Sequence, residues 1–114
     1  MIKKTFGASL LTTDTTLYEV PAGKKAEWVL LYATDTSGST THFSVDFYDA
    51  SASATLPVFF EYSLSAKTFF KIGGEYNAFV MMHEGDKIIA SCAGANDVSM
   101  LVSVIEYNDI IQGG

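Results

Sequence analysis

The chain contains no arginine, and its 13 acidic residues outnumber its 7 lysines to give a formal net charge of −6. Arginine is the residue best suited to paired hydrogen bonds with phosphates and with guanine. An acidic chain without arginine is therefore a poor match for a nucleic acid or for an anionic membrane surface. We expect neither as a partner.

Cysteine is almost absent as well: Cys92 stands alone, so no disulfide can form within the chain. No apolar run approaches the roughly 20 residues of a membrane span. Two lysines near the start precede a few apolar residues, as in a secretion signal, but Gly7, Ser9 and then polar residues 12–14 interrupt them. The sequence predicts synthesis in a cytoplasm without a signal peptide.

Helical periodicity is also missing. Aromatic and β-branched residues form short runs that glycine, serine, aspartate and asparagine separate, which is typical of strands. The pattern predicts strands at 3–9, 15–20, 25–35, 40–49, 57–63, 66–72, 76–82, 86–92 and 98–107. We expect an all-β chain forming one domain over residues 1–114, an antiparallel β-sandwich that is jelly-roll-like, with about eight or nine short strands.

Two of these strands have informative alternation. In residues 41–49, Phe43, Val45 and Phe47 share one face and polar residues the other, which predicts one packed face and one wet face. Residues 98–107 carry apolar side chains on both faces. This strand should be central and covered on each side, or covered on one side by a neighbouring subunit.

Turn residues mark the joins between strands. Residues 35–39, Asp-Thr-Ser-Gly-Ser, predict a hairpin, and Gly73-Gly74 permits positive φ between two later strands. In the segment TLYEVPAGKKAEW, residues 16–28, Pro21 and Gly23 predict a hairpin corner with Gly23 at positive φ.

No residue set predicts catalysis, a metal site or a cofactor. His83, Glu84 and Asp86 are possible metal ligands, but no second histidine lies near them, and the spacing fits a turn that Gly85 bends and Asp86 caps. Cys92 lies in an apolar strand end and is expected to be a small core residue. We therefore expect the protein not to be an enzyme.

Adjacent aromatic rings are the more informative feature. In the pairs Phe59-Phe60 and Phe69-Phe70, one ring should face the core and the other should face outward, where a sugar or a protein partner could cover it. Without a predicted cleft we favour a protein partner. The single tryptophan, Trp28, fits either a core strand or an interface. The predicted contact residues are Phe59, Phe60, Tyr62, Phe69, Phe70, Ile110 and Ile111, of which the two isoleucines lie beyond the last strand and either fold back or dock on another chain.

The order of four turn and strand motifs completes the pattern. Tyr-x-Val-Pro-Ala-Gly-Lys at 18–24 is followed by Ser37-Gly38, by Gly-Asp-x-Ile at 85–88 and by a valine-rich strand ending in Glu-Tyr at 98–107. This order resembles small β-sandwich proteins of tailed-phage virions, over about residues 15–107. The chain departs from longer members in having no recognisable separate receptor-binding domain.

The resemblance implies a non-enzymatic structural protein. Such proteins are capsid decoration or cement proteins, head fibres, or neck and tail accessory proteins, and they act by burying surface between subunits, often as trimers or rings. The implied partners are phage capsid, neck or tail subunits and further copies of the chain, and the implied location is the virion, after synthesis in the host cytoplasm. The alternative is a carbohydrate-binding or receptor-binding β-sandwich module of a tail fibre or spike, which would use the exposed rings.

Overall fold

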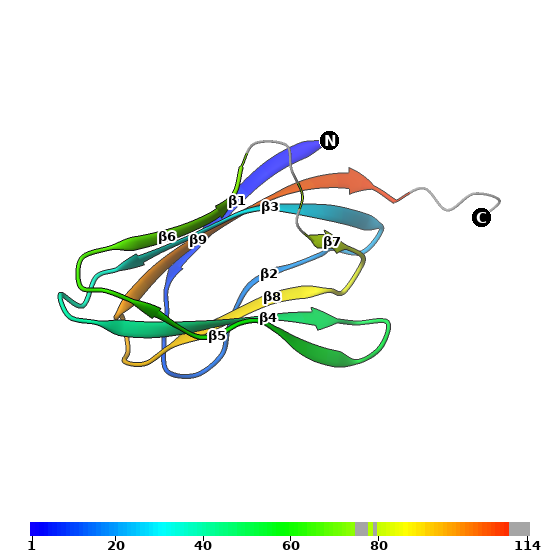
Figure 1. Cartoon of the computed structure of the whole chain (residues 1–114). Helices are drawn as coiled ribbons and strands as arrows, with labels where there is room; N and C mark the ends of the chain where they lie inside the picture. Colours follow the sequence, from blue (N-terminus) through cyan, green and yellow to red (C-terminus); the bar gives the residue numbers. More distant parts are fainter. Residues whose placement is uncertain (75–77, 79, 110–114) are drawn as a thin grey trace.

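The computed structural model describes residues 1–74, 78 and 80–109. These residues form two antiparallel β-sheets packed face to face, and no helix is found among them (Figure 1). The strands are β1 (Ile2–Ser9), β2 (Thr15–Glu19), β3 (Lys24–Asp35), β4 (Thr41–Asp49), β5 (Ala54–Leu64), β6 (Phe69–Gly73), β7 (Val80–Met82), β8 (Lys87–Cys92) and β9 (Val98–Asn108).

The strand order is that of a jelly roll. One sheet runs β1-β9-β3-β6, with β7 also paired to β3, and the other runs β2-β8-β4-β5. The pairs β1/β9, β2/β8, β3/β6 and β4/β5 are nested, so that the chain is one long hairpin folded over on itself, the arrangement of a jelly roll. The expected all-β sandwich is confirmed.

The predicted strands differ from the observed ones mainly at their ends. β5 begins at Ala54 and not at residue 57, whereas β6 begins at Phe69 and not at 66. Residues 76, 77 and 79 of the strand predicted at 76–82 lie outside the described residues; β7 covers Val80–Met82.

Both predicted hairpins are wrong. Residues 35–39 connect β3 to β4, and the segment 16–28 connects β2 to β3, yet in each case the two strands belong to different sheets. Turn residues mark where the chain reverses, but they do not determine whether the next strand pairs with the previous one. β3 pairs instead with β9, which is remote in sequence.

Positive φ was predicted for Gly23 and for the pair Gly73-Gly74. It is found at Gly23 and Gly73 but not at Gly74. Gly23 has a φ of 75° in the turn that the Lys24 N–H closes on the Pro21 carbonyl at 3.1 Å. Gly73 has a φ of 91°, while the Gly74 N–H donates to the Val29 carbonyl at 2.8 Å. A Cβ on residue 73 would lie 2.1 Å from that same carbonyl oxygen, so glycine is required there for space as well as for φ.

The core lies between the sheets and takes alternate residues from each. Phe43 and Val45 of β4 are fully buried, as their alternation predicted, and Trp28 of β3 is buried in the core and not at a surface. β9 lies between β1 and β3 and is central, as predicted. Its outer face is nonetheless uneven, because Ile105 is 7% exposed while Leu101 is 46% exposed.

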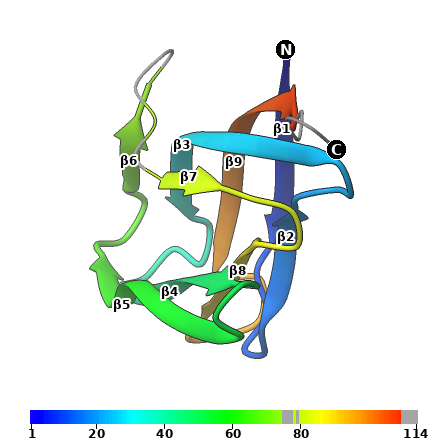
Figure 2. The same ribbon diagram turned by 90° about the vertical axis from the view of Figure 1, so that its right-hand side faces the viewer.

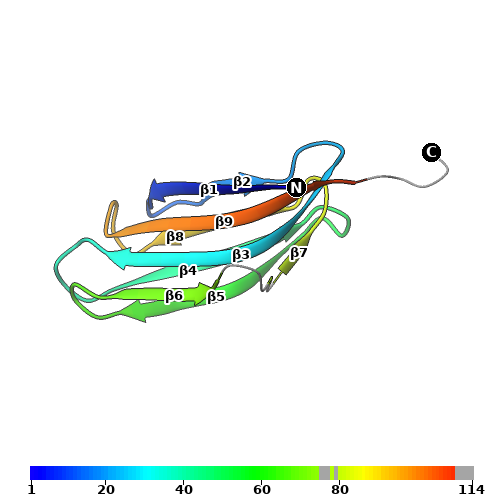
Figure 3. The same ribbon diagram turned by 90° about the horizontal axis from the view of Figure 1, so that it is seen from above.

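The sandwich has two long sides where the edges of the two sheets meet. On one side β1 lies over β2, and on the other β6 lies over β5, as the two rotated views agree (Figures 2 and 3). We call these the β1/β2 side and the β5/β6 side. Each side needs side chains to fill the opening between the sheets, and the two sides use different chemistry.

Candidate protein interface

An aromatic cluster closes the β5/β6 side. Phe43 of β4, Phe59 and Tyr62 of β5, and Phe70 of β6 pack ring to ring, with centroid distances of 4.5 Å for Tyr62–Phe70, 5.2 Å for Phe59–Phe70 and 5.6 Å for Phe43–Tyr62. The rings meet at tilted or edge-on angles, which are favourable for aromatic pairs. The cluster joins the two sheets at an edge that would otherwise be open.

A bulge in β5 makes this cluster possible. Phe43 pairs with Tyr62 and Val45 with Phe59, so three steps along β5 oppose two steps along β4. In a regular strand, residues three apart point to opposite faces. The extra residue brings Phe59 and Tyr62 to the same inward face.

The same bulge sends the next ring outward. Glu61 has a φ of 48°, and its N–H donates to the Ser44 hydroxyl at 2.9 Å instead of continuing the ladder. Phe60, between the two inward rings, is 75% exposed. The backbone that carries it is hydrogen-bonded to β4 through Glu61, so a partner would have little backbone freedom to remove there.

A second exposed ring lies on β6. Phe69 is 61% exposed and stacks on Tyr32 of β3 with centroids 5.2 Å apart and planes 5° apart. Across the sheet from Tyr32 lies Leu101 of β9, and a Cβ on Gly7 of β1 would lie 2.5 Å from the Leu101 side chain. Leu101 therefore lies over the glycine. We call Tyr32, Phe69 and Leu101 the outer patch.

These positions bear on the predicted contact residues. In both adjacent ring pairs one ring packs on the core, Phe59 or Phe70, and the other faces outward, Phe60 or Phe69, so that expectation is confirmed. That these rings contact a partner stays a prediction. Tyr62 belongs to the aromatic cluster and is still 40% exposed.

Ile110 and Ile111 lie outside the described residues. The outer patch adds Tyr32 and Leu101, which sequence reasoning did not single out. The apolar residues on the outer face of the last strand were the signal for Leu101, whereas nothing in the sequence indicates that Tyr32 stacks on Phe69.

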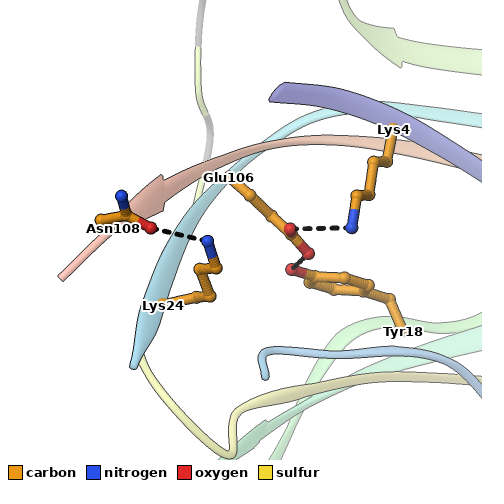
Figure 4. A network of polar contacts seen from close by, with 5 residues as sticks. All are labelled: Lys4, Tyr18, Lys24, Glu106 and Asn108. Carbon is orange, nitrogen blue, oxygen red and sulfur yellow. Dashed lines mark hydrogen bonds and ion pairs between the residues drawn. The ribbon is translucent and has the colours of Figure 1, made fainter. Parts of the chain in front are cut away.

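A polar network lies on the β1/β2 side (Figure 4). Glu106 of β9 is 4% exposed; one carboxylate oxygen accepts a hydrogen bond from the Tyr18 hydroxyl at 2.6 Å, and the other lies 3.0 Å from the Lys4 ammonium. The Tyr18 ring also packs against Phe6 with centroids 5.1 Å apart. Nearby, the Lys24 ammonium donates to the Asn108 side chain at 2.6 Å.

The network shifts two pKa values in opposite directions. Burial by itself raises the pKa of the Glu106 carboxyl, but the hydrogen bond from Tyr18 and the ammonium group of Lys4 outweigh burial and bring the net pKa below its ordinary value. Burial, and then the hydrogen bond to Glu106, raise the pKa of the Tyr18 hydroxyl. At neutral pH the geometry therefore holds an ionised glutamate against a protonated tyrosine.

The turn at His83–Asp86 has the predicted form. Gly85 has a φ of 86°, and Asp86 accepts the N–H of His83 at 2.8 Å through one carboxylate oxygen and the N–H of Ala50 at 2.9 Å through the other. Asp86 thereby caps its own turn and also holds the β4–β5 connection. Over the described ranges, no group of three or more His, Cys, Asp or Glu residues is placed to hold a metal ion.

Cys92 belongs to the core cluster, as predicted. Its side chain is 6% exposed, and the thiol donates to the Gly94 carbonyl at 2.9 Å.

Within the part of the chain that the structure describes, no helix has the length and apolar character needed to cross a membrane. Comparisons of the chain with protein-family models, with curated proteins and with solved structures find no match.

Proposed function

We propose that the protein is a non-enzymatic structural component of a tailed-phage virion, which stabilises the capsid or a neck or tail assembly through protein–protein contacts. The observation that carries the proposal is the pair of exposed phenylalanines on the β5/β6 side, Phe60 at 75% and Phe69 at 61% exposure. The class of partner comes from the resemblance of the turn-motif order to small virion β-sandwich proteins.

The exposed rings have the properties of interface anchors. Aromatic residues dominate the energetics of many interfaces because they bury a large area and have few rotatable bonds. Phe69 is stacked on Tyr32, and the backbone that carries Phe60 is held by the bulge, so ordering this surface on binding should cost little. A partner that covered both would have to contact the β5/β6 side.

The charge of the chain supports the same class of partner. With a net charge of −6 and no arginine, the protein would be repelled by packaged DNA and would suit the outside of a particle. Long-range attraction would come from basic groups on a capsid, neck or tail subunit.

The first test is mass spectrometry and cryo-electron microscopy of virions purified from the phage that carries this gene. We expect the chain in stoichiometric, symmetric positions on the head, neck or tail. Virions that lack the chain altogether would overturn the proposal.

The second test asks whether the exposed rings make the contact. Virions grown without the chain are mixed with wild-type protein or with the double variant Phe60→Ser/Phe69→Ser, and the bound fraction is measured by co-sedimentation. We expect the double variant to bind at least about tenfold more weakly, the loss of one or two anchor residues. The matched control is Leu56→Ser, since Leu56 is 54% exposed on β5 but lies far along the strand from Phe60; it should bind as wild type.

A carbohydrate-binding or receptor-binding module is the second candidate, because Phe69 and Tyr32 present stacked rings on an outer sheet face. A glycan array separates the two: a cement-type protein should bind no glycan, whereas binding that Phe69→Ser abolishes would favour the module.

A further inference from the structure

β1 is a long, regular strand edge exposed to solvent. It pairs with β9 through eight successive residues without a register shift, and six of its eight residues are exposed. No described strand pairs with its other side, and such an edge presents a row of N–H and C=O groups to any strand that can align with it.

The other described edges are blunted. β5 carries two register shifts, Pro57 and the positive φ of Glu61; β2 is short and has a register shift; β6 has five residues and β7 three. Short strands, bulges and proline are the usual protections of edges against pairing. β1 has none of these three protections. Its only protection against pairing is the charge of its two lysines, Lys3 and Lys4.

The hydrogen bonds between β1 and β9 show which backbone N–H and C=O groups of β1 point away from the sheet. The Leu10 N–H donates to the Val98 carbonyl at 2.8 Å, in continuation of the β1/β9 register. Hydrogen-bonded residues alternate along an antiparallel pair, so the even-numbered residues of β1 bond to β9. The backbone groups of Lys3, Thr5, Gly7 and Ser9 therefore point away from the sheet.

We infer that β1 pairs antiparallel with β1 of a second copy of this chain, about a twofold axis at Phe6. The two five-stranded sheets would then join into one continuous sheet. A strand edge paired with itself about a twofold axis is self-complementary, so one exposed edge is sufficient to close a dimer.

Charge disfavours a register centred closer to the lysines than Phe6. Centring the axis on Phe6 places Lys4 opposite Ala8 of the second copy and Lys3 opposite Ser9. The two copies of Lys4 are then four residues apart along the pair, about 14 Å, beyond the ~10 Å screening length of 0.1 M salt. An axis at Thr5 would halve that distance and bring the lysines into mutual repulsion.

Apolar exposure favours the same register. Phe6 would face Phe6 across the axis, as a cross-strand aromatic pair beside the Phe6–Tyr18 contact. At each end, Ile2 of one copy, which is 56% exposed, would lie next to residues 10 and 11 of the other, where Leu11 is 45% exposed. Dimerisation would thus cover apolar groups that the single chain leaves in water.

Amide exchange of the wild-type protein is the first test. As the concentration rises through the dimerisation range, exchange at Thr5 and Gly7 should slow by about tenfold or more. Phe6 and Ala8 are the internal control, because their amides are bonded to β9 within the same chain and should be protected at every concentration. Light scattering on the same samples should give twice the chain mass of 12.3 kDa.

A disulfide test then fixes the register, in a Cys92→Ala background to remove the native thiol. Residues that face each other at a non-hydrogen-bonded position have Cα atoms about 4.5 Å apart, within disulfide range. Phe6→Cys should form a cross-linked dimer on oxidation. Ala8→Cys is the matched control, since its two copies would lie about 14 Å apart, and it should stay uncross-linked.

A monomer or trimer by light scattering, unchanged exchange at Thr5 and Gly7, or equal cross-linking of both cysteine variants would overturn the inference. Should Phe6→Cys not fold, the exchange measurement on wild type still decides. The pairing does not depend on virion membership: a monomer would refute it and leave the proposed function standing. A trimer would instead favour the assembly that the family resemblance implies.

Discussion

The two long sides of the sandwich fill the opening between the sheets with different kinds of side chain. On the β5/β6 side, rings from three strands fill the opening, and the edge strand is bulged. On the β1/β2 side, a buried glutamate, a tyrosine and a lysine meet, and the edge strand is regular. The aromatic side has a blunted edge with exposed rings, which suits side-chain contact with a partner, whereas the polar side has a free backbone edge, which suits strand pairing.

The largest effect should come from the aromatic side. Phe43→Ala removes a fully buried ring that contacts Phe59, Tyr62 and Phe70, and we expect it to lower the free energy of unfolding by about 3–5 kcal/mol. Urea unfolding followed by fluorescence measures the change. A loss below about 1 kcal/mol would show that the cluster can collapse around the gap.

The polar side can be tested with two tyrosine–glutamate hydrogen bonds of equal length. Tyr18 donates to buried Glu106 at 2.6 Å, and Tyr107 donates to Glu27, also at 2.6 Å, on the outer face of the sheet. Tyr18→Phe should cost about 1.5–3 kcal/mol of unfolding free energy, because a buried carboxylate loses its donor.

Tyr107→Phe is the matched control and should cost much less, since water can replace the lost hydroxyl. Equal losses of unfolding free energy in the two variants, measured by urea unfolding, would argue that burial of Glu106 does not strengthen its hydrogen bond with Tyr18.

The third prediction concerns how the stability of the fold depends on pH. The pKa of Glu106 is lower in the folded chain than its ordinary value. Its contribution to the free energy of unfolding is therefore present at neutral pH and is lost as pH falls from about 4.5 through the lowered folded pKa. The pKa of Tyr18 is raised, so its contribution is complete below pH ~10 and is lost as pH rises further.

Glu106→Gln tests the acid side. Thermal unfolding from pH 7 to pH 3 should show a difference between wild type and variant that narrows as the pH falls. A constant difference over that range would assign the acid sensitivity to other carboxyls.

The smallest effect should come from an exposed ring. Phe60→Ser alters a side chain that is 75% exposed, and it should change the free energy of unfolding by no more than about 0.5 kcal/mol. Phe59→Ser, one residue earlier but packed in the cluster, serves as the contrast and should destabilise strongly. If Phe60→Ser proved as costly in urea unfolding as Phe59→Ser, the ring at 60 would have a role in the fold and would be a weaker candidate for a contact residue.

The sequence by itself determined the strands, the packed face of β4 and the glycines at positive φ, and it offered a central β9 as one of two alternatives. These are local properties: side chains alternate with a period of two, and a left-handed turn favours glycine. The same signals also predicted the inward and outward rings at 59–60 and 69–70.

Only the tertiary structure decided which strands pair. Local turn chemistry predicted hairpins at 16–28 and 35–39, but the nested pairing sends those connections from sheet to sheet. The inward turn of both Phe59 and Tyr62 needs a bulge that breaks the period of two, and the Tyr18–Glu106 bond joins residues 88 apart in sequence. Such features depend on the free energy of the whole packed arrangement, which no short segment contains.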